Sequence, residues 1–456
     1  MTRRRPCRLV AGLSVAAGVA LIVNTLAGGP VTGGLPHSYN GQGVLSAGAK
    51  SGVSAVDRPG HDARSGRSAR TQSRHASRTG AHRSAAEAAG SGTEEAGEQT
   101  EVTRHVTYAG TARTEFTYPG ASYVKVHFSR MLLRPGDWVT VSDPKNEQSY
   151  TYHADPRLVR LPTDSPSTDD GDGFWAMSIN GESAVVTLHK TLPDPGLGTF
   201  GLDVDRVAHG FTSSEKATRE ANERKAAGGR YPESVCGNDD SQDAVCYQTS
   251  DPVAYAHSLP VARLLINGTT LCTAWRVTSD DRMLTNNHCL GSQSDVSNTE
   301  VWFNYQCASC GGNDPEDVTK VPGDQLLRTG ERLDYTLFTV GDFASIQRFG
   351  YLGLDLSKPR SGEQVYIPQH PEGEPTKLSI ASDQDPNSTC QVDDPVMDGN
   401  GHDTDTGYRC DTEPGASGSP VIDSRTNRVI ALHHLGGCPN SGVRITLVYQ
   451  QIKSLL

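Results

Sequence analysis

Cysteines divide this chain into two unlike halves. Nine of its ten cysteines lie between residues 236 and 438, and the tenth, Cys7, lies near the amino terminus. Disulfides persist outside reducing compartments, so this clustering predicts a cross-linked domain in the carboxy-terminal half of an exported protein. Because nine is an odd number, one cysteine is left over when the others pair within the chain.

The amino terminus also indicates export. Four arginines between residues 3 and 8 precede an apolar run over residues 9–23, and small residues follow the run. This layout is that of a signal peptide, which we place at residues 1–27. An uncleaved membrane anchor is the alternative, but the run is of marginal length for a membrane span. We therefore predict a secreted protein with no stable membrane insertion after the signal is cleaved.

Two further segments lack the composition of a folded core. Residues 28–101 are rich in Gly, Ser, Ala, Arg and His and carry almost no large apolar side chain. Such a segment cannot bury enough apolar surface to offset chain entropy, so we predict a disordered linker there. Residues 212–233 are rich in Lys, Glu, Arg and Ala and begin with serines that are typical of a helix start. They predict a charged helical linker.

The segment between these linkers has the pattern of strands. Over residues 102–211, runs that alternate apolar and polar residues, such as Val124 to Phe128, are separated by Gly- and Pro-containing turns. Period-two alternation predicts a small β-sandwich-like domain. The acidic residues at 169–172 are of the type that binds calcium, but they lack the full EF-hand spacing. We therefore predict no metal and no cofactor.

The last segment, residues 234–456, contains the residues that could carry chemistry. Short β-like runs recur along it, and its final residues have helical spacing, so we predict an all-β domain with a terminal helix. In the stretch TEPGASGSP at residues 412–420, Gly415 lies two residues before Ser417. A glycine there lets the chain turn tightly and aim backbone N–H groups at one point, as a developing oxyanion requires.

A serine nucleophile needs a base, and the base needs a carboxylate that holds its tautomer. The stretch TNNHC at residues 285–289 offers His288, next to one cysteine and downstream of another, Cys272. The stretch LDYTLF at residues 333–338 offers Asp334 followed by an apolar run. His288, Asp334 and Ser417 are therefore the candidate catalytic residues.

These three stretches resemble the motifs of the trypsin-like serine protease superfamily. TEPGASGSP resembles its nucleophile loop, GDSGGP; TNNHC resembles TAAHC; and the motifs follow one another in the order of that superfamily, which differs from the order in subtilisins and α/β-hydrolases. Within the superfamily, residues 234–456 look most similar to bacterial lysyl and glutamyl endopeptidases. The resemblance implies a double β-barrel protease domain in which the N–H groups of Gly415 and Ser417 form the oxyanion hole.

The resemblance also implies a set of disulfides. By likeness to lysyl endopeptidases, the odd cysteine is Cys307, and the expected pairs are Cys272–Cys289, Cys246–Cys310, Cys236–Cys438 and Cys390–Cys410.

One departure from the family bears on activation. Ala416 stands where digestive trypsin-like enzymes have an aspartate that captures the new amino terminus after zymogen cleavage. That salt bridge cannot form here. If the chain is made as a zymogen, its amino-terminal part must inhibit by another route, such as steric cover, or assist folding. Whether residues 102–211 are an inhibitory propeptide, a folding aid or a retained targeting module stays open at this point.

Three residues are candidates for choosing the substrate. Asp411 coincides with the position of the specificity carboxylate of trypsin, which favours Lys or Arg before the scissile bond, whereas Thr412 and His433 resemble the acid-recognising pair of glutamyl endopeptidases. A carboxylate and a histidine that faced one pocket would select opposite substrates, so one of them should be structural. We predict a preference for basic residues, with a Glu-specific enzyme as the alternative.

The sequence thus predicts a secreted serine endopeptidase that acts on proteins or peptides as a monomer. A net charge of −11 gives no support for a nucleic-acid partner, which requires clustered Lys and Arg in a folded domain. A secreted surface-binding protein that has kept a protease scaffold is the rival hypothesis, and an enzyme whose natural substrates are esters is a second one.

Overall fold

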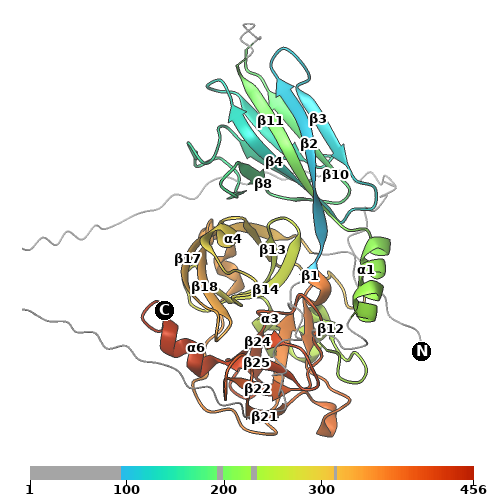
Figure 1. The fold of residues 1–456 in the computed structure, drawn as a ribbon, viewed down its shortest axis with the longest axis vertical. Helices are drawn as coiled ribbons and strands as arrows, with labels where there is room; N and C mark the ends of the chain where they lie inside the picture. Colours follow the sequence, from blue (N-terminus) through green and yellow to red (C-terminus); the bar gives the residue numbers. More distant parts are fainter. Residues whose placement is uncertain (1–93, 193–198, 227–233, 313–315) are drawn as a thin grey trace, which may run out of the picture. The chain divides into compact units, whose positions relative to one another are not determined.

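The computed structural model describes residues 94–192, 199–226, 234–312 and 316–456 (Figure 1). The predicted signal peptide and most of the predicted linker lie outside the described residues.

Two antiparallel sheets face each other in the first part of the structure. One sheet has the strand order β3 (Arg113–Thr117), β10 (Ser183–His189), β5 (Trp138–Ser142) and β6 (Ser149–Tyr152). The other has the order β2 (Gly97–Thr107), β11 (Gly201–Gly210), β4 (Tyr123–Leu132), β8 (Phe174–Ala176) and β7 (Ser167–Asp169), with β9 (Ile179–Asn180) paired to β4. Alternate apolar side chains of both sheets, such as Val141 and Val126, form one buried core, so this region is a β-sandwich.

The sandwich begins earlier than its sequence suggests. Strand β1 (Glu94–Glu95) and the start of β2 lie inside the segment predicted to be a disordered linker, so that boundary was wrong. The reason is that β2 pairs with β11 along most of its length, which satisfies its backbone groups, while most of its side chains point to solvent and are polar. A strand of this kind has no apolar periodicity for sequence analysis to detect.

The rest of the structure consists of two six-stranded barrels. The first barrel has the order β14 (Thr270–Arg276), β13 (Val261–Ile266), β16 (Thr299–Phe303), β17 (Thr319–Gly330), β18 (Tyr335–Val340) and β15 (Arg282–Thr285), and the pairing of β15 with β14 closes it. The second has the order β19 (Val365–Gln369), β23 (Pro420–Asp423), β24 (Arg428–Leu435), β25 (Asn440–Arg444), β22 (Asp405–Tyr408) and β21 (Val392–Met397). A bridge between Gln364 and Gln391 closes this second barrel. The predicted double-barrel fold is confirmed.

Short strands and helices complete the barrels. Strands β12 (Gln242–Asp243) and β20 (Lys377–Ser379) extend the second barrel beyond β19, and β1 extends the first barrel beyond β14. The helices are α1 (Ser213–Ala226), α2 (Tyr247–Ser250), α3 (Pro252–Ser258), α4 (Gln293–Ser297), α5 (Phe343–Ile346) and α6 (Ile445–Ile452). Helix α6 is the predicted terminal helix, and it packs its apolar face on the core shared by the two barrels.

The sandwich and the first barrel share a buried ion cluster. Lys125 of β4 reaches across to Glu300 of β16, with 2.8 Å between Nζ and Oε1, and both side chains are fully buried. The Glu300 carboxylate also accepts hydrogen bonds from the backbone and the hydroxyl of Ser178, in the sandwich, and from Trp302. Lys320 of β17 in turn donates to the Ser178 carbonyl oxygen at 2.8 Å. The two parts are thus joined by polar groups that water cannot reach.

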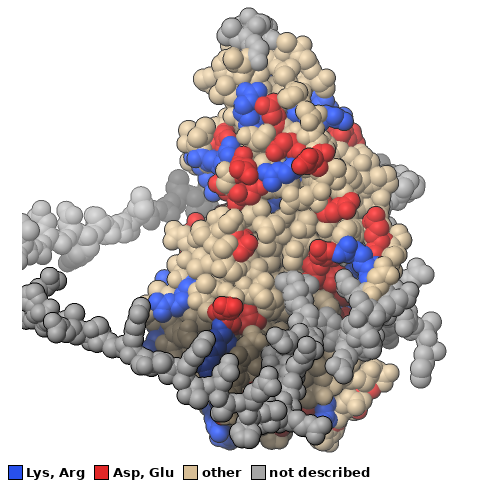
Figure 2. All heavy atoms as spheres, viewed as in Figure 1, with Lys and Arg blue, Asp and Glu red and all other residues tan. Residues whose placement is uncertain are grey.

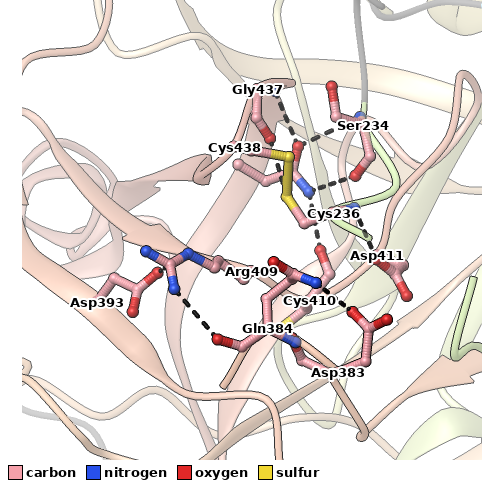
Figure 3. The surroundings of a disulfide bond; sticks show 12 residues. Ser234, Cys236, Asp383, Gln384, Asp393, Arg409, Cys410, Asp411, Gly437 and Cys438 are labelled. Carbon is pink, nitrogen blue, oxygen red and sulfur yellow. Dashed lines mark hydrogen bonds and ion pairs between the residues drawn. A yellow bond between two sulfur atoms is a disulfide. The ribbon is translucent and has the colours of Figure 1, made fainter. Parts of the chain in front are cut away.

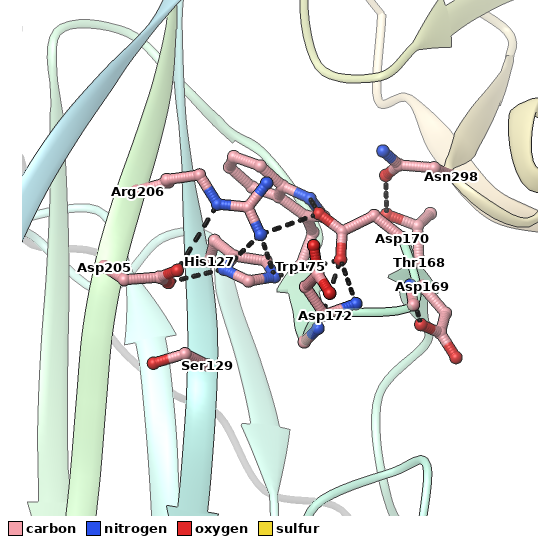
Figure 4. A network of polar contacts seen from close by, with 12 residues as sticks. His127, Ser129, Thr168, Asp169, Asp170, Asp172, Trp175, Asp205, Arg206 and Asn298 are labelled. Carbon is pink, nitrogen blue, oxygen red and sulfur yellow. Dashed lines mark hydrogen bonds and ion pairs between the residues drawn. The ribbon is translucent and has the colours of Figure 1, made fainter.

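The acidic loop of the sandwich is engaged by protein groups. Asp170 accepts hydrogen bonds from the backbone of Gly173 and from the indole of Trp175, and it forms an ion pair with Arg206 at 2.9 Å (Figure 4). Its carboxylate also lies 3.3 Å from Nε2 of the buried His127. These partners outweigh burial and hold the pKa of Asp170 well below its usual range. The loop is therefore a structural network.

Charged side chains are interspersed on the surface. On the face seen in Figure 2, Lys and Arg alternate with Asp and Glu over the described residues, so the two signs of charge are not segregated there. Among the described residues, no helix is long and apolar enough to cross a membrane.

Candidate active site

The loop after β15 brings His288 to Asp334, which lies at the start of β18. The Nδ1 atom of His288 is 2.7 Å from Asp334 Oδ2, and the His288 backbone N–H donates to Oδ1 at 3.0 Å. Asn286 donates from its side chain to the Asp334 carbonyl oxygen, which fixes the aspartate from the other side. Two hydrogen bonds between the same two residues hold the imidazole in one orientation, with Nδ1 as the donor.

Asp334 is almost completely buried and remains ionised. Burial raises the pKa of its carboxyl, but the hydrogen bonds from His288 and from His434 outweigh burial and bring this pKa well below its usual range. The carboxylate is therefore available as a permanent acceptor for His288. The other ring nitrogen of His288, Nε2, is buried and has no hydrogen-bond partner among the described residues.

Ser417 lies next to the histidine loop. The carbonyl oxygen of Ser417 accepts a hydrogen bond from the backbone N–H of Thr273 in β14 at 2.8 Å. The same oxygen lies 4.0 Å from the sulfur of Cys289. Cys289 directly follows His288 and forms a disulfide with Cys272 of the same strand β14. The nucleophile loop and the histidine loop are therefore both fastened to one strand. Ser417 is completely buried in this structure.

The turn before Ser417 has the geometry that its Pro-Gly sequence favours. The Ala416 N–H donates to the Glu413 carbonyl at 2.9 Å, and Gly415 has φ of 95°. Proline at the second position and a residue with positive φ at the third are the marks of a type II turn. The carbonyl of Pro414 accepts from the backbone N–H of Glu372. Because the N–H of a peptide points away from its C=O, the Gly415 N–H faces away from Glu372.

Glycine is also required directly after the nucleophile. Gly418 has φ of 91°, and a Cβ atom at this position would lie 2.0 Å from the carbonyl oxygen of Thr273. Its N–H donates to the carbonyl of His433 in β24 at 3.0 Å. The close approach of this glycine to β14 therefore sets the position of Ser417 between the two barrels.

The structure gives Asp411 a role that the sequence did not indicate. Asp411 is 2% exposed, and its two carboxylate oxygens accept from the backbone N–H groups of Cys236 at 2.9 Å and of Asp240 at 2.7 Å (Figure 3). Burial raises its pKa to about 7. Both oxygens are thus used to hold the first residues of the protease domain, which argues against Asp411 as a selector of basic substrates.

The two other specificity candidates lie near the nucleophile. Thr412 is adjacent to the turn that precedes Ser417, and its Oγ1 is buried without a hydrogen-bond partner among the described residues. His433 is fully buried, and its Nδ1 lies 2.7 Å from the hydroxyl of Tyr408. Burial, together with the neighbouring His434, lowers the pKa of His433 to about 3, so this imidazole is neutral.

Sequence analysis missed two residues of the site. His434 lies 3.0 Å from Asp334 through its Nδ1 and 2.7 Å from Asp405 of β22 through its Nε2. A pair of adjacent histidines at 433 and 434 was visible in the sequence, but it gave no sign of which one would face the Asp334 carboxylate. Nothing in the sequence around Asp405 marked it.

Four disulfides join the described cysteines, and they are the pairs that the resemblance implied. They link Cys236 to Cys438, Cys246 to Cys310, Cys272 to Cys289 and Cys390 to Cys410. The remaining cysteine of the domain, Cys307, is buried. Figure 3 shows the first of these bridges, beside the contact between Cys236 and Asp411.

Known proteins resemble parts of this chain. The family model of the trypsin-like peptidase domain matches residues 272–432. The secreted RxLR effector protein 73 of Plasmopara viticola is 32% identical over 339 residues, which make up 71% of this chain and 77% of that protein. Among solved structures, a Glu endopeptidase in complex with MPD matches 49% of this chain and 98% of its own, with 16% identity and a TM-score of 0.35. An inactive form of the Rv3671c protease matches 46% and 94%, with 16% identity and a TM-score of 0.33.

Proposed function

The chain belongs to the trypsin-like peptidase family, and from that premise we propose that it is a secreted serine endopeptidase. The observation that carries the proposal is the double hydrogen bond between His288 and Asp334, beside a nucleophile loop fastened to the same strand as the histidine loop. A histidine whose Nδ1 is held by a buried carboxylate presents Nε2 as a base. A protein that used this scaffold only for binding would have no need of this arrangement.

The chemistry follows from the atoms in the site. The Oγ atom of Ser417 attacks the carbonyl carbon of the scissile peptide while Nε2 of His288 takes its proton. The C–N bond breaks when His288 returns that proton to the leaving amine, and water then releases the acyl group by the same route. The N–H groups of Gly415 and Ser417 bind the oxyanion, and each such donor contributes about 3–4 kcal/mol to lowering the barrier.

The test is peptide hydrolysis by the purified, processed protein beside a Ser417→Ala variant. We expect the variant to lose roughly 10⁴–10⁶-fold in kcat. A Ser424→Ala variant, changed in a surface turn of the second barrel, serves as the matched control and should keep full activity. Peptide cleavage that survives in Ser417→Ala would overturn the proposal, and hydrolysis of esters without amides would favour the esterase alternative.

For the specificity, we propose that the residue before the scissile bond is acidic. Asp411 is occupied by backbone donors, whereas Thr412 Oγ1 is a buried polar atom with no partner among the described residues. Nδ1 of the neutral His433 lies 2.7 Å from the Tyr408 hydroxyl, and we assign the tautomer in which the hydroxyl donates to Nδ1, because Nε2–H can then donate to a substrate carboxylate. This replaces the preference for basic residues expected from the sequence with the Glu-specific alternative.

Cleavage of a peptide library decides between the acidic and the basic preference. Cuts after Glu or Asp, greatly reduced in a His433→Asn variant but retained in Asp411→Asn, are the expected result. Cuts after Lys or Arg that disappear in Asp411→Asn would restore the basic-residue hypothesis. Active-site titration with a serine-directed reagent provides the control, because it distinguishes a change of selectivity from a loss of folded enzyme.

Export is the next part of the proposal. The homologous Plasmopara viticola protein is described as secreted, and four disulfides suit an oxidising compartment. We expect the protein to be recovered from the culture medium, and amino-terminal sequencing should find a start near residue 28, or further along the chain if the enzyme is processed. Retention of the full chain inside cells would contradict export.

We also propose that the unprocessed chain is latent because its own strand covers the site. Strand β1 pairs with Thr270 and Leu271 of β14, two to three residues from Thr273, whose N–H bonds to Ser417. Peptide substrates commonly bind as an added strand on a sheet edge, and β1 already occupies this edge. The burial of Ser417 is consistent with such a covered state.

Helix α1 holds β1 in this position. Lys216 donates to the Glu372 carbonyl at 2.8 Å and pairs with its carboxylate at 3.0 Å, and Arg219 forms an ion pair with Glu95 of β1. A Lys216→Ala/Arg219→Ala double variant should therefore hydrolyse peptides faster than the wild type before processing. A Lys145→Ala variant, on an exposed turn of the sandwich, is the control. Equal rates in all three proteins would refute the latency but leave the peptidase assignment standing.

A further inference from the structure

A second histidine contacts the same oxygen of the catalytic aspartate. Oδ2 of Asp334 accepts from Nδ1 of His288 at 2.7 Å and also meets Nδ1 of His434 at 3.0 Å. His434 lies near the end of β24 and is only 1% exposed at its side chain. Its Nε2 meets Oδ2 of Asp405, which comes from β22 in the second barrel, at 2.7 Å. Two aspartates therefore enclose one imidazole.

The contacts determine the charge of this imidazole. An ionised carboxylate can only accept hydrogen bonds, so a ring nitrogen that faces one must carry a proton. Both nitrogens of His434 face carboxylate oxygens, and an imidazole with two N–H groups is a cation. The hydroxyls of Thr404 and Ser441 also donate to Asp405, which favours its ionised form. His434 is therefore held as a buried positive charge.

Other ionisable groups nearby do not cancel this charge. His433, the preceding residue on β24, is neutral because burial lowers its pKa. His288 contacts the same Asp334 oxygen as His434, and Asp334 and Asp405 are the acidic groups in contact with the His434 ring. Burial alone would lower the pKa of His434, but these two carboxylates outweigh it and raise this pKa to about 9.

We propose that His434 and Asp405 are positioning residues of the peptidase: they hold a buried cation against Asp334, which fixes the carboxylate toward His288 and extends activity to lower pH. The inference rests on the proposed function, because it concerns the base of that site. His434 and His288 contact the same carboxylate oxygen of Asp334, and a buried cation there opposes a second positive charge beside it. We therefore expect the enzyme to keep its activity at a lower pH than a variant without His434.

The pH profile of kcat/KM tests this role. In a His434→Gln variant the cation is lost, and a like charge within about 4–6 Å shifts a titration by about 1–3 units, so the acid limb should move up by about one unit or more. At a pH one unit below the new midpoint the variant should therefore show about tenfold less activity relative to its own plateau. If the acid limb of the His434→Gln profile stays at the wild-type pH while kcat/KM falls equally at every pH, the role of His434 is purely structural. That result would overturn the proposal.

Asp405→Asn is the second variant, because it is isosteric and removes only the counter-charge. Its acid limb should shift in the same direction, and the double variant should shift no further than His434→Gln alone, since Asp405 acts through His434. If the shifts of the acid limb in the two single variants added up in the double variant, Asp405 would not be acting through His434. An Asp403→Asn variant, changed on the exposed loop before β22, serves as the control and should leave the profile in place.

One readout is independent of catalysis. Nitrogen-15 NMR of the imidazoles should show both nitrogens of His434 protonated at neutral pH in the Ser417→Ala protein, with the doubly protonated signal lost in Asp405→Asn. A neutral His434 would overturn the inference even if the enzyme is active. A protonated His434 in a protein without Ser417-dependent hydrolysis would instead count against the proposed function.

Discussion

The buried ion pair between Lys125 and Glu300 predicts that the sandwich is an integral part of the folded unit. The Glu300 carboxylate receives the Lys125 ammonium at 2.8 Å, two hydrogen bonds from Ser178 and one from Trp302. Burial raises the pKa of Glu300, but Lys125 and Lys320 outweigh it and bring this pKa down to about 2. Removing Lys125 therefore leaves a fully buried carboxylate that has lost the first of the two lysines that favour its charged form.

The perturbation is Lys125→Met, which keeps an unbranched side chain one heavy atom shorter and removes the charge. Breaking a buried pair from one side leaves an uncompensated charge and costs about 3–5 kcal/mol. Adding Glu300→Gln removes that charge, so the double variant should be more stable than Lys125→Met alone by at least about 1 kcal/mol. Urea unfolding at pH 7 measures each value, and Lys145→Met on an exposed turn should change stability by no more than about 0.5 kcal/mol.

The refuting outcomes are specific. A loss of less than about 1 kcal/mol in Lys125→Met, or a double variant whose loss equals the sum of the two single losses, would show that the pair is not buried and coupled as described. If the account holds, proteolysis between the sandwich and the barrels should leave the two parts bound to each other. The sandwich is then expected to stay bound after cleavage, and release of the latency requires only that β1 leave β14.

Three further predictions follow from single contacts. Gly415→Ala places a Cβ on a residue with φ of 95°, 2.9 Å from the His370 carbonyl oxygen, so the turn must shift and turn its N–H away from the oxyanion; kcat should fall by about 10²–10³-fold, measured by steady-state kinetics beside circular dichroism to check the fold. Because the pKa of His434 is raised from 6.5 to about 9, its stabilisation is full below pH 6.5 and is lost as the pH rises through 9; urea unfolding should find that the stability of the wild type relative to His434→Gln falls by up to about 3 kcal/mol over this range. Tyr123→Phe removes the buried hydrogen bond from the phenol to the Gly268 carbonyl and should cost about 1 kcal/mol, seen as a lower urea midpoint.

Sequence motifs singled out His288, Asp334 and Ser417 because the chemistry proposed for them constrains the residues next to them. The turn before Ser417 needs Pro414 and Gly415 for its dihedral angles, and His288 needs a cysteine next to it to fasten its loop, so both leave short local patterns. The double barrel was predictable for the same reason, since its strands alternate or are continuously apolar between turns.

Contacts between distant residues could not be anticipated. Glu300 is an isolated acidic residue in an apolar strand, and only the folded structure brings Lys125 to it. His434 and Asp405 meet because β24 and β22 both flank β25, which no local pattern encodes. Asp411 matched a family position, yet its carboxylate turned out to hold backbone N–H groups at the start of the domain. A position in a motif therefore identified a residue without identifying its partner.

Covalent labelling tests the central claim most directly. The processed protein is treated with a fluorophosphonate, which phosphonylates an activated serine with loss of fluoride, and the modified peptide is located by mass spectrometry. We predict a single adduct on Ser417 that forms rapidly in the wild type and is almost absent in His288→Ala. Labelling that falls on another serine, or that does not depend on His288, would contradict the assignment of this site.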